Sequence, residues 1–279
     1  MSVTSRLAGR LPEGAVVAAI HLAYQRAEPE LRRLDDICGR GGVMVDVGAW
    51  YGPWAARLAQ RAARVVAFEP TPLHQVLKRR LPSNVEVIAA AASDQRGEAQ
   101  LWLAGTGTGA EGLSSFHKRG VHAVSARVPK IPVDELDLTG VTFIKIDVDG
   151  HEVPVLHGAE KTIRRDAPPL LIEVEARIQP IESIVGLLRD WGYTGWVLDA
   201  RIWRPLDGFD LERRQAATQN VADRGLFRTA LWPYPRYLNS VLFRRGDSPP
   251  NAVQTDRQAD RQAAGRAARP AARPTKDQK

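Results

Sequence analysis

The sequence predicts an α/β fold in which helices cover both faces of a mainly parallel sheet. Short apolar runs have the length and composition of buried parallel strands. Segments with helical periodicity separate these runs, and a repeated strand–helix–strand order produces right-handed crossovers. The chain has 279 residues, of which 44% are hydrophobic, so it can form one large domain with a well-buried core.

The first predicted element is an amphipathic helix, because apolar residues recur every three or four positions until glycines end the pattern. This stripe consists of Val17, Ile20, Tyr24, Ala27, Leu31 and Leu34. Residues 1–40 are therefore predicted to form a helical extension before the main domain.

Buried strands and helices are then predicted in alternation. The predicted strands of the parallel sheet are 43–47, 64–69, 85–92, 143–147 and 170–174. The predicted helices are 54–63, 73–80, 153–165 and 181–191. Further extended segments are predicted at 100–103, 125–132, 195–198 and 240–243, with a glycine-rich, ligand-adaptive loop at 105–112. The main domain is thus expected to span 41–246.

Two segments depart from this alternation. Residues 209–239 form a long insertion before the last strand, and Trp232, Tyr234 and Tyr237 favour an ordered cap over the site. Residues 247–279 contain Ala, Arg, Gln, Pro and Asp with almost no apolar bulk, so they are predicted to be a disordered basic tail.

Composition limits the functional classes. The formal charge is +7, and five Arg and two Lys against four Asp in the tail account for +3 of it. The remaining +4 is weak support for a nucleic-acid-binding face, which needs clustered charge. A single cysteine, Cys38, excludes an intrachain disulfide and is compatible with the cytoplasm, where we expect the chain to be. The sequence contains no run of about twenty apolar residues, so it predicts no membrane span.

Polar residues follow the first two predicted strands. The stretch Asp46-Val-Gly-Ala-Trp-Tyr-Gly52 lies at the end of the first strand, where ligands bind in open parallel sheets. Gly48 permits close backbone approach, and the missing Gly-x-Gly-x-x-Gly pattern favours a cofactor without a pyrophosphate. Glu69, at the tip of the second strand, can accept both hydroxyls of a ribose. Either motif could instead be structural.

The stretch from Lys145 to Glu152 concentrates ionisable groups after the fourth strand. Asp147 can hold the ammonium of a cofactor, and His151 can take a proton from a hydroxyl near neutral pH. Asp149 and Glu152 could orient His151. The alternative is that these acids only cap the following helix.

Glu173 and Glu175 follow the fifth strand. Asp147 and Glu173 could face each other and bind Mg²⁺, which prefers hard oxygen ligands. They could equally be hydrogen-bonded helpers of the base. His117 and His122 flank the glycine-rich loop and are interpreted as surface or hydrogen-bonded histidines.

At these motifs the chain resembles the FkbM family of methyltransferases, which use S-adenosylmethionine (SAM). The resemblance covers roughly residues 40 to 200. It is carried by stretches at 46–49, 68–70, 89–97, 112–115, 131–136, 144–152, 156–159 and 171–173. The resemblance implies a Rossmann-like, seven-stranded class I methyltransferase sheet whose last strand is antiparallel, and O-methylation of hydroxyls on sugars or polyketides.

The resemblance also assigns residues to the cofactor. Asp46 and Gly48 would line the methionine part of SAM, Glu69 would bind the ribose, and Ser93 with Asp94 would lie near the adenine.

Two departures from the family pattern bear on the site. Trp50-Tyr51-Gly52 replaces the usual Asn-x-Gly, which would alter the pocket above the methionine, and Trp50 is included in the predicted cofactor site. Pro70, which follows Glu69 in the matched stretch, is included as well. Asp149 stands where the family commonly has Glu, and it completes the predicted catalytic set with His151 and Asp147.

The sequence-based hypothesis is therefore SAM-dependent O-methylation of a small hydroxylated acceptor, with His151 as base and Asp147 as an orienting group. The alternative is a SAM-binding module or methyltransferase that engages nucleic acid through the tail and the aromatic insertion. A homodimer is compatible with the sequence.

Overall fold

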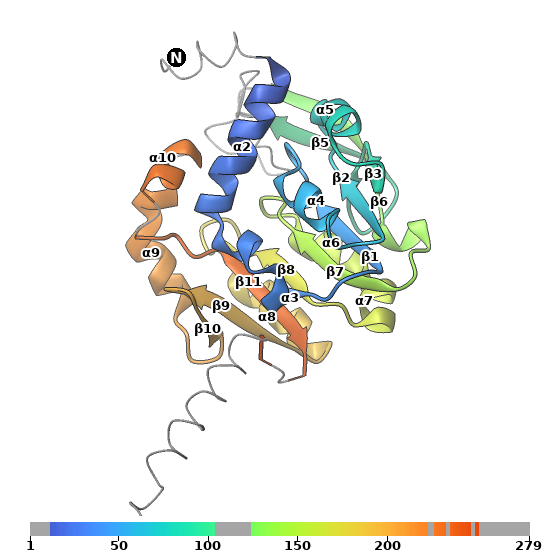
Figure 1. Ribbon diagram of the computed structural model, residues 1–279. Coiled ribbons are helices and arrows are strands. Elements are labelled where there is room, and N and C mark those ends of the chain that lie inside the picture. The colour runs from blue at the N-terminus through green and yellow to red at the C-terminus, as the bar shows by residue number, and fades with distance from the viewer. Residues whose placement is uncertain (1–11, 104–123, 223–225, 233–234, 247–248, 251–279) are drawn as a thin grey trace, which may run out of the picture.

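An eight-stranded sheet forms the centre of the molecule (Figure 1). The computed structural model describes residues 12–103, 124–222, 226–232, 235–246 and 249–250. The strand order is β10-β9-β11-β8-β7-β1-β2-β3. These strands are β1 (Val43–Val47), β2 (Arg64–Phe68), β3 (Val85–Ile88), β7 (Val141–Ile146), β8 (Leu170–Glu173), β9 (Tyr193–Asp199), β10 (Ile202–Pro205) and β11 (Ser240–Arg245).

The α/β class and the antiparallel last strand are confirmed, but the predicted count of seven strands is wrong. β11 runs antiparallel to both β8 and β9. The additional strand, β10, folds back on β9 as a hairpin and is also antiparallel. Its turn is made by Ala200 and Arg201 with φ of 45° and 73°, so no glycine marks this turn in the sequence.

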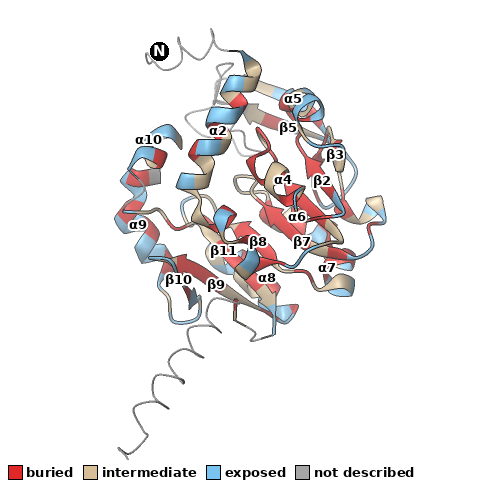
Figure 2. Cartoon of the chain, viewed as in Figure 1, coloured by how far each residue is buried: buried red, intermediate tan, exposed pale blue. Residues whose placement is uncertain are grey.

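Helices cover both faces of the sheet. They are α2 (Glu13–Ala27), η1 (Pro29–Arg32), α3 (Leu34–Ile37), α4 (Pro53–Leu58), α5 (Leu73–Arg80), η3 (Val133–Leu136), α6 (Glu152–Gly158), α7 (Glu160–Asp166), α8 (Ile181–Asp190), α9 (Leu211–Ala222) and α10 (Leu226–Leu231). Alternate strand residues point to opposite faces, so Val45 packs with the α6–α8 side and Met44 with the α3–α4 side. Figure 2 shows that the central strands are buried.

A second, three-stranded sheet has the order β4-β6-β5. It consists of β4 (Ala91–Ala92), β5 (Gly97–Leu103) and β6 (Val124–Ile131). The single strand predicted at 85–92 is therefore divided, because its first half pairs with β2 and its second half pairs with β6.

Two predicted helices are broken. The N-terminal helix ends at Ala27, because Glu28 is extended and Pro29 cannot continue the hydrogen-bond ladder. The apolar stripe continues through η1 and α3. The helix predicted at 153–165 divides at Ala159, beside Gly158, where an added Cβ would lie 1.8 Å from the carbonyl oxygen of Ser93.

The N-terminal helix and the insertion lie together. α2 packs against α4 and α10, and α9 and α10 belong to the predicted insertion (Figure 1). The glycine-rich loop at 105–112, His117, His122, Tyr234 and nearly all of the predicted tail lie outside the described residues. Within the described part of the chain, no helix combines the length and hydrophobicity that a membrane span requires.

Candidate active site

The carboxyl ends of β1 and β2 bring Asp46 and Glu69 to the same edge of the sheet. Val47 pairs with Phe68, and the next two backbone amides, Gly48 N and Ala49 N, donate to Phe68 O at 3.1 and 2.9 Å. Glu69 Oε2 accepts a hydrogen bond of 2.8 Å from Trp50 N. The sequence therefore predicted correctly that these strand ends lie side by side.

Glu69 is buried, with only 4% of its surface exposed, and hydrogen bonds hold its carboxyl group in place. Its Oε1 accepts hydrogen bonds from Thr71 N at 2.9 Å and Thr71 Oγ1 at 2.5 Å. Burial raises the pKa of Glu69 to about 7 against the opposing effect of these bonds. Pro70 follows it and is half-buried. Glu69 is thus a preoriented acceptor whose ionisation is costly.

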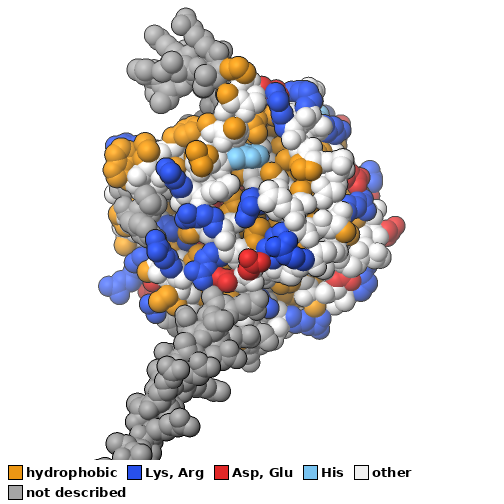
Figure 3. Space-filling model, viewed as in Figure 1, with side chains coloured by type: hydrophobic (Ala, Val, Ile, Leu, Met, Phe, Trp, Pro, Cys, Tyr) orange, Lys and Arg blue, Asp and Glu red, His pale blue; other side chains and the backbone are white. Residues whose placement is uncertain are grey.

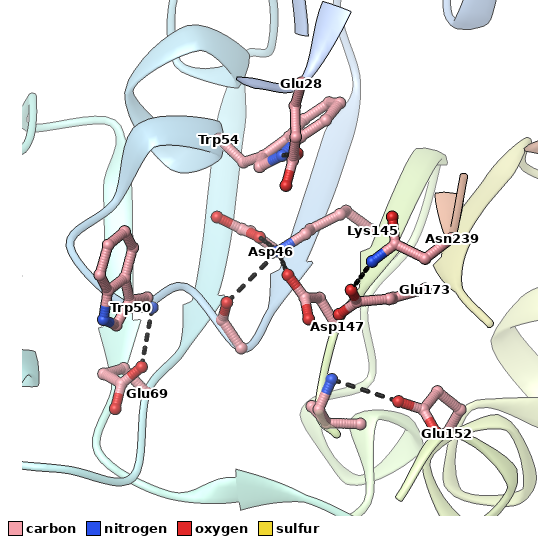
Figure 4. A network of polar contacts seen from close by, with 12 residues as sticks. Glu28, Asp46, Trp50, Trp54, Glu69, Lys145, Asp147, Glu152, Glu173 and Asn239 are labelled. Atoms are coloured by element: carbon pink, nitrogen blue, oxygen red, sulfur yellow. Dashed lines mark hydrogen bonds and ion pairs between the residues drawn. The ribbon is translucent and has the colours of Figure 1, made fainter. Parts of the chain in front are cut away.

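Five ionisable side chains form what we call the central cluster: Glu28, Asp46, Lys145, Asp147 and Glu173 (Figure 4). Lys145 Nζ donates to Asp147 Oδ2 at 3.0 Å and to Gly48 O at 3.4 Å, and it lies 3.7 Å from Asp46 Oδ1. Asp46 is fully buried, and neither of its carboxylate oxygens accepts a hydrogen bond from the described residues. One ammonium group therefore lies within ion-pair distance of two carboxyl groups.

Burial and neighbouring charges give the carboxyl groups of the cluster different protonation states. Burial raises the pKa of Asp46 despite Lys145. Burial acts in the same direction on Asp147, but Lys145 and a hydrogen bond from Glu173 lower its pKa. Burial and the charge of Asp147 hold the pKa of Glu173 well above its usual range. Asp147 is therefore the ionised partner and Glu173 the neutral, donating partner of a carboxyl pair.

Asn239 fixes the orientation of Glu173. Its Nδ2 donates to Glu173 Oε1 and, at 3.4 Å, to Glu175 Oε1 (Figure 4). Our sequence interpretation did not include Asn239. It directly precedes β11, and the start of an antiparallel strand lies at the edge where parallel strands end, so that position could have marked it.

The N-terminal extension contributes Glu28 and Tyr24, which sequence reasoning also missed. Trp54 Nε1 donates to Glu28 Oε2 at 2.7 Å, and burial raises the pKa of Glu28 to about 7 although Lys145 opposes this. The Tyr24 ring lies 5.7 Å from the Trp50 ring, centroid to centroid. Burial, together with the charges of Glu28 and of the Asp147–Glu173 pair, raises the pKa of Tyr24. The extension thus forms a wall of the site.

Gly48 allows two strand ends to meet. Its φ is +81°, and an added Cβ would lie 1.9 Å from the carbonyl oxygen of Asp147. The sequence predicted close approach of a ligand at Gly48, and the close approach found in the structure is that of the backbone that follows β7. Trp50 also has a positive φ, of 50°, and its buried Nε1 has no hydrogen-bond partner among the described residues.

His151 lies beside the predicted adenine residues. Its Nε2 shares a hydrogen bond of 3.0 Å with Ser93 Oγ, which donates to Asp94 Oδ1 at 2.9 Å. The carboxylate of Glu152, which we expected to orient His151, accepts hydrogen bonds from Val148 N, Gly150 N and Gln179 Nε2. Asp149 has a φ of 51° and lines a small depression with Glu173 and Glu175.

The contacts of Asp147 and Glu173 give no support to the metal prediction. The two carboxyl groups face each other, as expected, but Glu173 donates a hydrogen bond to Asp147, and their other partners are Asn239 and Lys145. No group of three or more His, Cys, Asp or Glu side chains in the described part of the chain could hold a metal ion. Both carboxyl groups are therefore already hydrogen-bonded or ion-paired within the protein.

A family model decides the assignment of the chain. The model described as the methyltransferase FkbM domain matches residues 43–194, which is more than half of the chain. The chain belongs to the FkbM methyltransferase family. In this FkbM chain the matched range begins with β1 and ends in β9, so α2, α9, α10 and β11 lie outside it.

Several solved structures are similar in fold. Methyltransferase FkbM from Methylobacillus flagellatus KT is 20% identical over 59% of this chain and 42% of that chain, with a TM-score of 0.41. This chain thus spans less than half the length of that protein. An rRNA methylase from Streptococcus thermophilus is 11% identical over 78% and 95% of the two chains, with a TM-score of 0.42. A putative methyltransferase from Streptococcus mutans in complex with SAH has 11% identity, the same coverages and a TM-score of 0.39. No curated protein matches the chain significantly.

Proposed function

We propose that this FkbM chain transfers a methyl group from SAM to a hydroxyl oxygen of a small molecule. The observation that carries this proposal is the central cluster, in which four carboxyl groups gather near one lysine and two of them, Asp46 and Asp147, lie 3.7 and 3.0 Å from its ammonium nitrogen (Figure 4). Carboxylates at the carboxyl ends of parallel strands suit a ligand with an ammonium group, and a bound cation would offset the cluster's negative charge.

The residues at the strand ends fit SAM. Asp46 has buried oxygens without hydrogen bonds from the described residues, so it could accept bonds from an ammonium group. Glu69 is rigid and has spare acceptor capacity for a ribose hydroxyl. Ser93 and Asp94 would lie near the adenine, as the family resemblance implies. Trp50 would present its unpaired indole N–H to the same ligand.

Bound SAM would supply a methyl group that its sulfonium has already activated. The chain then needs to orient the acceptor hydroxyl and remove its proton. We assign proton removal to Asp147, because Lys145 keeps this carboxylate ionised and Glu173 steadies it by donating a hydrogen bond. A hydroxyl becomes strongly acidic while its oxygen gains a methyl group, so a weakly basic carboxylate suffices. His151 instead contacts Ser93 and would support the cofactor side of the site.

A sugar is the acceptor that we favour, whether on a glycolipid, a polysaccharide or a glycosylated natural product. Aromatic faces pack well against sugar rings. Trp232 is 60% exposed, and the guanidinium carbon of Arg177 lies 5.8 Å from the centroid of the Tyr237 ring, next to Glu175. We further propose that the reaction takes place in the cytoplasm, with which the single cysteine is compatible. The nucleic-acid alternative would use the basic tail, nearly all of which lies outside the described residues.

Two substitutions test the assigned base. Asp147→Asn should lower kcat by ~10²–10⁴-fold, because an amide cannot take the proton, while SAM binding persists. His151→Ala should reduce turnover far less. Labelled SAM, a panel of hydroxylated acceptors and single-turnover kinetics would give kcat, and calorimetry would give the Kd of SAM.

Three outcomes would contradict parts of the proposal. Loss of turnover in His151→Ala with retention in Asp147→Asn would return the role of base to His151. Unchanged SAM affinity in Asp46→Asn would remove Asp46 from the cofactor site. Failure of the unsubstituted chain to bind SAM would contradict the cofactor assignment as a whole.

A further inference from the structure

Four arginines line a cavity beside the N-terminal extension. The cavity of about 330 Å³ lies where the end of α2, η1, the β9–β10 turn and α10 meet. Its volume is at the lower end of the ~300–1,000 Å³ typical of small-molecule sites. The residues that define this arginine pocket are Arg26, Arg32, Arg201, Arg236, Ala230 and Leu231.

Most of the positive charge in the arginine pocket is not neutralised by the protein. Arg236 forms a bidentate ion pair with Glu30 at 2.6 and 2.7 Å. Arg26, Arg32 and Arg201 are exposed and form no ion pair with any described carboxylate. Figure 3 shows basic side chains gathered on this face, around α2 and α10. Like charges that converge on one cavity favour a bound anion.

Arg201 occupies a position where the backbone favours glycine. Its φ is +73°, within the turn between β9 and β10. A side chain in this conformation costs about 1–2 kcal/mol, and Arg201 lines the cavity despite this backbone strain.

The side chains identify the chemistry of the anion. All four basic residues are arginines, whose planar guanidinium groups match the oxygens of a phosphoryl group better than lysine does. Ala230 and Leu231 provide an apolar wall for the group that carries the phosphate.

The arginine pocket and the central cluster share two backbone segments. Ala27 and Pro29 line the pocket, while the side chain of Glu28 between them joins the central cluster. Arg236 lines the pocket, and Asn239, three residues later, binds Glu173. We propose that the arginine pocket binds a phosphoryl or pyrophosphoryl group of the acceptor, an inference that rests on the proposed function.

Calorimetry with inorganic pyrophosphate at low salt tests the site. The unsubstituted chain should bind saturably, and the double variant Arg26→Ala/Arg32→Ala should lose at least about tenfold in affinity. The control Arg127→Ala/Arg189→Ala removes the same charge from side chains that are 85% and 63% exposed elsewhere, and it should bind normally. Equal affinity in the double variant, or no binding by the unsubstituted chain, would overturn the inference.

Vesicles distinguish the two sources of the phosphoryl group. Arginine-dependent sedimentation with phosphatidylglycerol vesicles, but not with phosphatidylcholine vesicles, would indicate a lipid-linked acceptor. Pyrophosphate binding without sedimentation would indicate a soluble phosphorylated acceptor. SAM affinity is measured on the same variants and should not change. A chain that binds SAM but no pyrophosphate overturns only this inference, and the reverse result overturns only the cofactor assignment.

Discussion

At the scale of the residue, Gly48 joins the ends of β1 and β7. Gly48→Ala should destabilise the fold by several kcal/mol, because its Cβ would lie 1.9 Å from the Asp147 carbonyl oxygen. Gly41→Ala is the matched control, since Gly41 has a similar φ of +83° and nothing within 4 Å of an added Cβ. It should cost only about 1–2 kcal/mol, and urea unfolding of both variants would measure the difference. Equal losses would refute the proposed clash.

The predicted site residues differ in how far the sequence could define them. Asp46, Glu69 and Asp147 lie at or just beyond the carboxyl ends of neighbouring strands, so simple topology brings them to one edge. Glu28 and Asn239 come from segments outside the strand pattern, and tertiary packing alone brings them in. No periodicity in the sequence relates position 28 to a strand end, so it could not be predicted.

At the scale of the element, one buried ion pair joins η1 to the segment before β11. Glu30 is 1% exposed and pairs with Arg236. Arg236→Ala should cost about 3–5 kcal/mol, because it leaves a buried carboxylate unpaired. Removing the exposed pair Arg189–Glu182 with Arg189→Ala should cost no more than about 1 kcal/mol.

Thermal and urea unfolding would measure both losses. A second variant, Glu30→Gln, should partly restore the stability of Arg236→Ala by removing the unpaired charge. If Arg236→Ala is no more harmful than Arg189→Ala, then the buried pair does not hold these elements together.

Elements were predictable where local pattern and tertiary structure agree. Buried strands such as β1 and β7 are short apolar runs, and their alternate residues pack on opposite faces. β10 was missed because Arg201 takes a positive φ without a glycine to indicate a turn. The break between α6 and α7 depends on contact between Gly158 and Ser93, which are 65 positions apart in the numbering. Such contacts leave no local pattern.

At the scale of the whole molecule, buried acids should make stability depend on pH. Burial raises the pKa of Glu28, Glu69 and Glu152 to about 7, above the usual value of 4.5. The folded chain therefore binds more protons than the unfolded chain between these values, and stability falls as the pH rises through 7. Each carboxyl contributes on the order of 1–3 kcal/mol.

We expect the Tm of the ligand-free chain to fall between pH 5 and pH 8, as calorimetry would show. Glu28→Gln should flatten this dependence, since glutamine keeps an acceptor for Trp54 Nε1 and does not titrate. Groups with lowered pKa values, such as Asp147 and Asp166, remain ionised across this range and do not contribute. A Tm that rises over the same range would show that these carboxyls are solvated.

The pairing of Glu30 with Arg236 also bears on how the chain is made. The two residues are 206 positions apart, so during synthesis Glu30 leaves the ribosome long before its counter-ion exists. Contacts of such separation close late, because a long loop must be ordered first. The part of the sheet made of β3, β2, β1, β7 and β8 can form earlier. We therefore expect the nascent domain to acquire its layered framework first and to gain an enclosed reaction centre only after the segment that contains Arg236 has been synthesised.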